Sequence, residues 1–299
     1  MQGLADLHRH LDGSIRPSTL AEFATRAGRR VPSDLAFHVG MGLDEALAKF
    51  GFTLSLLQDP AAIRRVASEI CEDAAAESVT TLEIRFAPQL HQGASIEAIV
   101  DAVLEGASGR AGIVLCGLYG EDVNVLNQLV AVASTREGVV GIDLAGGPST
   151  HHRYALVDYA GPFRRAAEFG LGRTVHAGEG RPPAEIRAAI EVLGANRIGH
   201  GTTLLDDPSI VDLVLAREVT IEACITSNVH VGAIASAMDH PLATWLTLGV
   251  RATVCTDNTL LSQVSASSEY GVARLLPGMT EELFATAVTN GHNAAFGAR

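Results

Sequence analysis

Short apolar segments alternate with longer amphipathic segments along most of the chain. In the amphipathic segments apolar residues recur at spacings of three and four, which is the period of a helix with one buried face. Short apolar runs predict buried strands. Strands are expected at 4–7, 81–86, 113–118, 139–144, 172–175, 197–199, 219–224 and 250–255, and helices at 61–77, 96–105, 160–168, 183–193, 209–216, 241–247 and 281–290.

Strands that alternate with helices predict an α/β fold with a parallel sheet. Eight predicted strands favour a closed (β/α)8 TIM barrel, although the strand count alone leaves an open doubly wound sheet as an alternative. The length of 299 residues suits one barrel, a fold that often has ~250 residues or more. We therefore expect a single domain over residues 1–299. The long segment 12–79 is expected to hold extra helices that cap the C-terminal mouth of the barrel.

The composition narrows the classes of partner and compartment. A formal charge of -12 and a pI of about 5.3 disfavour a nucleic acid partner, because an acidic surface repels phosphates. The four scattered cysteines predict reduced thiols in the core. The N-terminal residues lack the pattern of a signal peptide, and no apolar run reaches the ~20 residues that span a bilayer. We expect a cytoplasmic protein without membrane contact, and the oligomeric state is left open.

Ionisable side chains follow several predicted strands, at the end where barrel enzymes carry their chemistry. His8 and His10 are two residues apart and therefore point to the same side of a strand. His176 follows the fifth strand, and Asp257 follows the eighth. Three imidazoles and one carboxylate suit Zn²⁺, which lowers the pKa of a bound water to roughly 7. Taken singly, the same residues are also compatible with buried core histidines and a helix cap.

Two further residues are candidate proton-transfer groups. Glu179 lies three residues beyond His176, after a glycine that allows a sharp turn. His200 lies between two glycines, directly after the sixth predicted strand. Ordinary turn chemistry is the alternative explanation for both residues.

Six segments resemble motifs of the adenosine deaminase family, in the order expected for that family. A single piece such as H-x-H is a weak signal, but the ordered set is a strong one. It covers the chain from its N-terminus to about residue 262. The segments are DLHRHLDGS (6–14), DLAGGP (143–148), RTVHAGEG (173–180), RIGHG (197–201), TSN (226–228) and CTDN (255–258).

The resemblance implies a barrel that deaminates adenosine or a closely related 6-aminopurine nucleoside to the 6-oxo product and ammonia. In that reaction Glu179 protonates a ring nitrogen of the purine, which makes C6 more electrophilic. His200 deprotonates or orients the zinc-bound water that attacks C6, and Asp257 steers the same water. The resemblance implies one zinc ion per chain, with the ligands His8, His10, His176 and Asp257.

Substrate-binding roles are implied for three further residues. Asp12 would meet the ribose hydroxyls, and Gly146 would offer its backbone N–H to the purine. Many members of the family have a second aspartate where this chain has Asn258. An amide donates a hydrogen bond at any pH, whereas a carboxyl group must be protonated to do so. Asn258 is therefore expected to donate to purine N7, and the difference leaves open a subgroup with another substrate.

Other polar and aromatic residues carry weaker signals. Phe50 and Phe52, in the segment expected to cap the barrel, would either wall an apolar pocket or pack between helices. Tyr119, Asp122 and Asn124 follow the third predicted strand, where a role in the site is possible, but a polar loop is favoured. His151 and His152 are predicted to lie in a loop, and His240 is predicted to start a helix.

Alternative functions differ from this one in the residues that they require. A deaminase of a modified adenosine or of free adenine would keep the same metal and acid–base residues. A two-metal amidohydrolase would resemble enzymes with a carboxylated lysine, but Lys49 is the only lysine and lies in the cap segment. A purine-binding protein without turnover would lack part of the acid–base pair, yet Glu179 and His200 are both present. The H-x-E…P-C-x-x-C signature of deaminases that act on nucleic acid is absent.

Overall fold

Eight parallel strands form the centre of the molecule in a computed structural model, which describes residues 3–149 and 151–297. They pair in chain order, from the first to the eighth. The strands are β1 (Leu4–His10), β2 (Val79–Phe86), β3 (Gly112–Leu118), β4 (Val139–Ala145), β5 (Gly172–Ala177), β6 (Arg197–His200), β7 (Thr220–Ala223) and β8 (Arg251–Val254).

The sheet closes on itself between β1 and the residues that follow β8. The backbone N–H of His10 donates to the carbonyl of Asp257 at 2.8 Å, and the N–H of Asp257 donates to the carbonyl of His8 at 2.7 Å. The predicted (β/α)8 barrel is therefore confirmed, and the open sheet is excluded. Closure also brings two predicted site segments, one from each end of the chain, into direct backbone contact.

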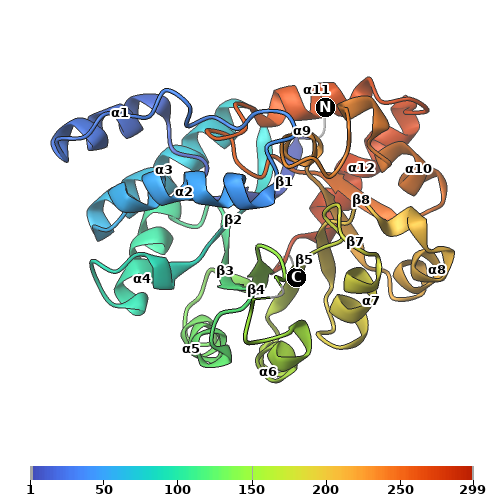
Figure 1. Cartoon of the computed structure of the whole chain (residues 1–299), viewed down its shortest axis with the longest axis horizontal. Helices are drawn as coiled ribbons and strands as arrows, with labels where there is room; N and C mark the ends of the chain where they lie inside the picture. Colours follow the sequence, from blue (N-terminus) through green and yellow to red (C-terminus); the bar gives the residue numbers. More distant parts are fainter. Residues whose placement is uncertain (1–2, 150, 298–299) are drawn as a thin grey trace.

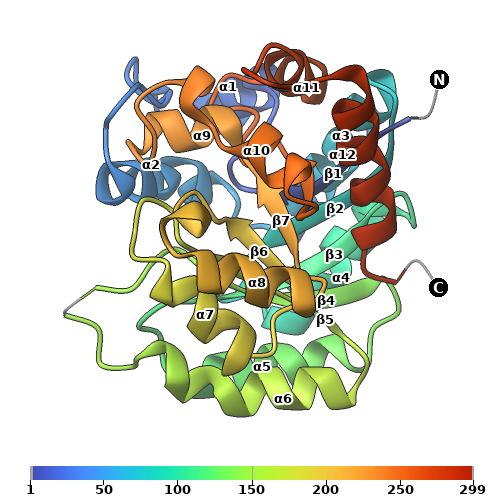
Figure 2. The same ribbon diagram turned by 90° about the vertical axis from the view of Figure 1, so that its right-hand side faces the viewer.

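Helices surround the strands on the outside (Figure 1). In the view of Figure 2, α1 and α2 lie together with α9 on one side, and α12 runs along the opposite side near the C-terminus. No helix among residues 3–149 and 151–297 is long and apolar enough to cross a membrane. The helices are α1 (Pro17–Arg26), α2 (Leu43–Leu56), α3 (Pro60–Ala76), α4 (Ile96–Ala107), α5 (Val123–Ala133), α6 (Ala160–Glu168), α7 (Ala184–Glu191), α8 (Pro208–Ala216), α9 (Ile225–His230), α10 (Leu242–Thr247), α11 (Ala266–Arg274) and α12 (Glu281–Ala294).

The apolar core lies between the strands and the surrounding helices, whereas the inside of the barrel is polar. Along β2, Leu82, Ile84 and Phe86 belong to the buried apolar cluster, while Glu83 and Arg85 alternate with them and form buried ion pairs. Successive side chains of a strand point to opposite faces, so this alternation separates the two environments. Each strand is buried on both sides, which explains why the strands stood out as apolar runs with occasional charges.

Three helices were not predicted: α5, α9 and α11. The predicted polar loop includes Asp122, which precedes α5, but the prediction is wrong for Asn124, which lies in the first turn of that helix. The Asp122 carboxylate accepts a hydrogen bond from the backbone N–H of Asn124 and caps α5, which begins at Val123. His152 does lie in a loop, and α10 begins two residues after His240, close to the predicted start. The four cysteines are buried and unpaired, as expected.

Candidate functional site

A cavity of about 700 Å³ opens at the C-terminal ends of the strands. Its walls include residues of α2 and of the loops after β1, β4, β5 and β8. The sequence-predicted site residues that line it are His10, Asp12, Gly146, His176, Glu179, His200, Asp257 and Asn258.

Four polar atoms converge at the base of this cavity. The Nε2 atoms of His8 and His10 are 3.2 Å apart, and Nε2 of His10 lies 3.3 Å from Nε2 of His176. Oδ1 of Asp257 lies 3.6 Å from Nε2 of His8 and 3.4 Å from Nε2 of His10. Ligand atoms around an ion with bonds of about 2.0–2.2 Å lie about 3.3–3.6 Å apart in a tetrahedral arrangement. The four side chains therefore have the spacing and the donor chemistry to hold one such ion.

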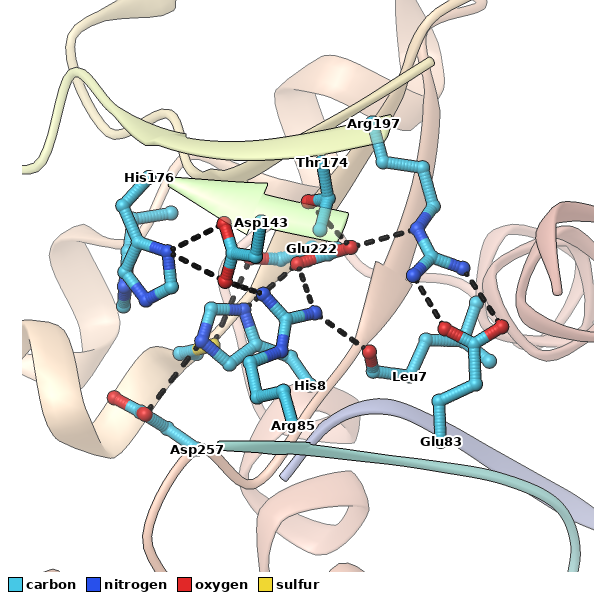
Figure 3. Close-up of polar contacts among 12 residues, drawn as sticks. Leu7, His8, Glu83, Arg85, Asp143, Thr174, His176, Arg197, Glu222 and Asp257 are labelled. Atoms are coloured by element: carbon cyan, nitrogen blue, oxygen red, sulfur yellow. Dashed lines mark hydrogen bonds and ion pairs between the residues drawn. The ribbon is translucent and has the colours of Figure 1, made fainter. Parts of the chain in front are cut away.

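Carboxylates behind the rings of His8 and His176 fix which ring nitrogen faces the point where the four ligand atoms converge (Figure 3). Nδ1 of His8 lies 2.7 Å from Oε2 of Glu222, and Nδ1 of His176 lies 3.1 Å from Oδ2 of Asp143. A ring that donates from Nδ1 keeps the lone pair of Nε2 available. Carboxylate partners of this kind orient metal-binding histidines and raise their basicity.

The same carboxylates take part in an ion network inside the barrel. Nη1 of Arg85 lies 2.9 Å from Asp143, Nη2 of Arg85 lies 2.8 Å from Glu222, and Nε of Arg197 lies 2.7 Å from Glu222. Arg197 also pairs with Glu83, and the two arginines flank Glu222 (Figure 3). Both arginines are essentially unexposed. A buried charge is costly unless an opposite charge lies beside it, and each arginine has such a partner.

Burial and neighbouring cations keep the first two imidazoles neutral. Burial, together with the charge of Arg85, holds the pKa of His8 well below its usual value. Burial and the nearby His176 hold the pKa of His10 well below its usual value. For His176, burial is the largest influence and acts to lower the pKa, but the charge of Asp143, its hydrogen bond to the ring and the charge of Asp257 together outweigh burial, and the pKa is raised. Cation binding favours the neutral rings, since a protonated imidazole has no free lone pair.

Glu179 and His200 lie together on the cavity wall. Nδ1 of His200 is 3.5 Å from Oε1 of Glu179, and both side chains are almost unexposed. Burial, with a contribution from the charge of Asp257, raises the pKa of Glu179 to about 7. Burial holds the pKa of His200 well below its usual value. At neutral pH the site thus offers a carboxyl group that can hold a proton and a neutral imidazole, which is a usable acid–base pair.

His200 and Asp257 both have left-handed backbone conformations, with φ of 69° and 60°. Such values are uncommon outside glycine and cost energy, so the surroundings must hold them in place. Oγ of Ser227 donates to Oδ2 of Asp257 at 2.5 Å, and the amide of Asn228 lies 2.9 Å from Nδ1 of His200. Consecutive residues of α9 thus hold the two strained residues.

The three predicted substrate-binding residues lie at the same cavity. Asp12 is buried, its Oδ1 has no hydrogen-bond partner among the described residues, and burial raises its pKa to about 6. Gly146 has φ of +78° and open space around it. Oδ1 of Asn258 packs against Gly13, where a β-carbon would come within 1.9 Å of that oxygen. Gly13 therefore permits the close approach of Asn258.

Sequence reasoning missed several residues that support the site. Asp143 and Glu222 were given no role, although an acidic residue inside an apolar strand segment is a detectable signal. Ser227 and Asn228 lie in the TSN motif, but the sequence around them has no helical period that would predict α9. Tyr119 does lie in the turn after β3, as predicted, but it is buried, lines the cavity and donates from its hydroxyl to the carbonyl of His176 at 2.9 Å, so it is part of the site and not only of a polar loop.

The two cap phenylalanines and the lysine have different environments. Phe50 lines the cavity, with its ring 6.1 Å from that of His10. Phe52 instead lies under the guanidinium of Arg29, at 4.7 Å from the ring centroid. Lys49 lies in α2 and pairs with Glu45 at 3.9 Å, away from the strand ends, as predicted.

Comparisons with known proteins extend over nearly the whole chain. A family model described as adenosine deaminase matches residues 3–298. The chain is similar to an adenosine deaminase of Serratia proteamaculans, with 35% identity over 315 aligned residues that cover 98% of this chain and 93% of that protein. Its structure is similar to an adenine deaminase of Arthrobacter aurescens, with a TM-score of 0.88, 25% identity and coverage of 100% and 95%. It is also similar to an arabidopsis N6-mAMP deaminase, with a TM-score of 0.85, 25% identity and coverage of 98% and 93%.

Proposed function

Because the chain belongs to the adenosine deaminase family and is therefore a hydrolytic deaminase, we propose that it acts on a 6-aminopurine nucleoside with one zinc ion. Its products are the 6-oxo nucleoside and ammonia, and adenosine is the first substrate to test. The observation that carries the proposal is the convergence of four ligand atoms at 3.2–3.6 Å beside the Glu179–His200 pair. A metal-dependent deaminase needs this combination of groups.

The proposed ligands of the ion are His8, His10, His176 and Asp257. Neutral imidazole nitrogens with one carboxylate oxygen are donors that Zn²⁺ prefers, and softer sulfur donors are not part of the set. The family is metal-dependent, and the carboxylates behind His8 and His176 support the same assignment. When bound, zinc supplies the Lewis acidity that makes a water molecule nucleophilic at neutral pH.

We assign the ring-protonating role to Glu179. Addition to C6 places negative charge on the ring, and a proton delivered to a ring nitrogen neutralises that charge as it develops. A carboxyl group with an ordinary pKa would be ionised at pH 7, whereas burial raises the pKa of Glu179 to about 7. A substantial protonated fraction is then present without losing the ability to give up the proton.

The proton released by the attacking water goes to His200 in this proposal. Its imidazole is neutral at pH 7 because burial holds its pKa well below the usual value. Nε2 of His200 has no hydrogen-bond partner among residues 3–149 and 151–297, so it is free to accept a proton from a molecule in the cavity. Asp257 would orient the same water through its carboxylate, which Ser227 holds.

Asp12 supports a nucleoside in preference to a free base. Its buried Oδ1 has no partner within the described part of the chain, and a ribose hydroxyl would supply one. Its charge, together with those of Asp44 and Glu45, makes the cavity lining net acidic even though Arg181 also lines it, and this balance disfavours a phosphorylated substrate. Gly146 and Asn258 would complete the purine contacts through a backbone N–H and an amide N–H.

The direct test is ammonia release by zinc-loaded protein, with the product identified by mass. Adenosine, 2′-deoxyadenosine, adenine and AMP are compared at equal concentration. The proposal expects inosine from adenosine and at least a tenfold lower kcat/KM for adenine and AMP. Efficient turnover of adenine or AMP with little turnover of adenosine would contradict the nucleoside assignment. No turnover of any of the four by protein that retains zinc would contradict the proposed function as a whole.

A further inference from the structure

We propose that Arg181 distinguishes the substituents at purine C2, so that the site also accepts 6-aminopurine nucleosides with an oxygen at C2 and disfavours those with an amino group there. The inference rests on the proposed function, because it places the purine in that site. It goes further by naming a specificity-determining residue and a second class of substrate. Hydrolysis of a 2-oxo-6-aminopurine nucleoside consumes one water and releases ammonia and the 2,6-dioxo nucleoside.

Arg181 is the only arginine or lysine among the described residues that line the cavity. It follows β5, two residues after Glu179. Both carboxylate oxygens of Glu185 hold its Nε, at 3.1 and 3.0 Å, and the hydroxyl of Thr203 donates to its backbone carbonyl at 2.7 Å. The side chain is therefore fixed at Nε, and a bound molecule can meet the guanidinium only through its terminal nitrogens.

The terminal nitrogens of Arg181 have no hydrogen-bond partner in residues 3–149 and 151–297. Nη2 is buried there without a partner. Nη1 is less enclosed and lies over Gly147, where a β-carbon would come within 1.7 Å of it. A guanidinium carries donors only. An oxygen acceptor on a bound molecule would therefore supply a partner, whereas an amino group would set donor against donor.

The proposed contacts of the purine place C2 beside this guanidinium. A purine nucleoside has three ring nitrogens with free lone pairs, N1, N3 and N7, because N9 carries the ribose. Glu179 would protonate N1, which is bonded to C6, and Asn258 would donate to N7, so N3 is left for the backbone N–H of Gly146. C2 joins N1 to N3 and therefore faces the wall between Glu179 and Gly146. Arg181 lies over Gly147, the neighbour of Gly146, so its guanidinium is part of this wall.

A phosphate is the other acceptor that a guanidinium could bind, but the fold places the ribose elsewhere. The ribose is expected at Asp12, which follows β1, whereas Arg181 follows β5. These two strands are four positions apart in a barrel of eight, so they lie on opposite sides. A substituent at C2 also has room, because a β-carbon at Gly146 would have no neighbour within 4 Å. The observations therefore favour a C2 oxygen as the acceptor.

The test compares Arg181→Met with the parent protein, both loaded with zinc, on three nucleosides that differ at C2. Adenosine carries hydrogen there, isoguanosine carries oxygen, and 2,6-diaminopurine riboside carries an amino group. Each kcat/KM is divided by that for adenosine, so that differences in ring reactivity are common to both proteins. The measurements are made at pH 6, because burial raises the pKa of Glu179 to about 7 and loss of the Arg181 charge would raise it further.

We expect the isoguanosine ratio to fall about tenfold or more in R181M, because a hydrogen bond from a charged donor is lost. The ratio for 2,6-diaminopurine riboside should rise about threefold or more, because donors no longer face its amino group. Arg187→Met is the matched control, since Arg187 lies on α7 and does not line the cavity. Both ratios should be the same in R187M as in the parent.

Binding of reaction products gives a second readout that does not require turnover. Inosine and guanosine differ only in the amino group at C2, and calorimetry measures both dissociation constants. The parent should bind guanosine about tenfold or more weakly than inosine, and R181M should reduce this difference to less than about threefold.

Unchanged substrate and product ratios in R181M would overturn the proposal. A selective loss of AMP binding in R181M would also overturn it, in favour of a phosphate contact. If no 6-aminopurine nucleoside is deaminated but R181M loses the discrimination between inosine and guanosine, the proposed function fails while the role of Arg181 at C2 stands.

Discussion

Asp143 joins a proposed metal ligand to a buried arginine. Its Oδ2 lies 3.1 Å from Nδ1 of His176 and 2.9 Å from Nη1 of Arg85. One carboxylate thus directs Nε2 of His176 toward the other ligand atoms and also neutralises a charge that has no access to water. Glu222 repeats the arrangement for His8, so the ion network of the barrel supports the site from below.

Replacement of Asp143 by asparagine should weaken zinc binding by about 10–100-fold, which is typical for the loss of a carboxylate behind a metal-binding histidine. The amide keeps the shape but loses the charge that raises the pKa of His176. Competition with a chelator of known affinity measures the change. Asp101→Asn, which breaks the exposed pair with Arg136, is the control and should leave zinc affinity unaltered. Equal affinity in the two variants would refute a role of Asp143 in metal binding.

Glu179→Gln should retain zinc and lose about 10²–10⁴-fold in kcat, because glutamine cannot transfer a proton to the ring. Elemental analysis and steady-state kinetics with adenosine measure the two quantities on one preparation. His176→Ala is the contrasting variant, since it should lose the metal together with activity. Near-normal turnover in E179Q would show that another group protonates the purine.

The pH dependence of kcat/KM should reflect the raised pKa of Glu179. The protonated carboxyl is the active form, so activity is expected to be lost as pH rises through about 7. Burial is the main cause of the shift, and the charge of Asp257 adds to it. Asp257→Asn is unsuitable as a test of this assignment, because it removes a proposed metal ligand. Arg181→Met is used instead. The charge of Arg181 lowers the pKa of Glu179, so removing it should shift the loss of activity to higher pH. A limb that does not respond to this change would argue against Glu179 as the titrating group.

Much of the barrel could be predicted from sequence because each strand is buried on both faces. The outward residues pack on helices, and the inward charges interrupt the apolar runs only at every second position. The helices α5 and α9 were missed for different reasons. Helix α5 begins directly after the polar stretch that ends at Asp122, and α9 has only six residues, too few to show a helical period.

The candidate site was predictable where its residues follow strands, but its supporting contacts were not. His8, His10, His176 and Asp257 come from three strand ends that only barrel closure brings together. Glu222 touches His8 across 214 positions in sequence, and no local pattern encodes such a pair. The direction of a side chain inside the barrel depends on the register between neighbouring strands, which a single sequence does not specify.

Asn258→Asp tests the departure of this chain from the pattern with two aspartates. We expect activity of N258D to fall relative to the parent as pH rises, because aspartate donates to purine N7 only when protonated. The ratio of parent to variant kcat/KM for adenosine, measured between pH 5.5 and 8.5, should grow with pH. With 7-deazaadenosine, which lacks the N7 acceptor, the ratio should stay flat. A flat ratio with adenosine as well would mean that Asn258 does not donate to N7.

Glu269→Gln should be more stable relative to the parent at pH 8 than at pH 5. Burial raises the pKa of Glu269 to about 7, although hydrogen bonds from Thr226 act in the opposite direction. A carboxyl group whose folded pKa is raised contributes stability that is fully present below the unfolded pKa of about 4.3. That contribution is lost as pH rises through about 7.

The glutamine side chain has no charge to bury at high pH and can still accept a hydrogen bond from the backbone N–H of Thr226. The difference in unfolding free energy between E269Q and the parent should therefore increase with pH, by an amount on the order of 1–3 kcal/mol. Urea unfolding at pH 5 and pH 8 measures this difference, and Glu97→Gln on the exposed start of α4 serves as the control with no expected pH dependence. A difference that shrinks as pH rises would mean that the Thr226 hydrogen bonds stabilise the carboxylate more than burial destabilises it, and the α9 turn would then depend on an ionised Glu269.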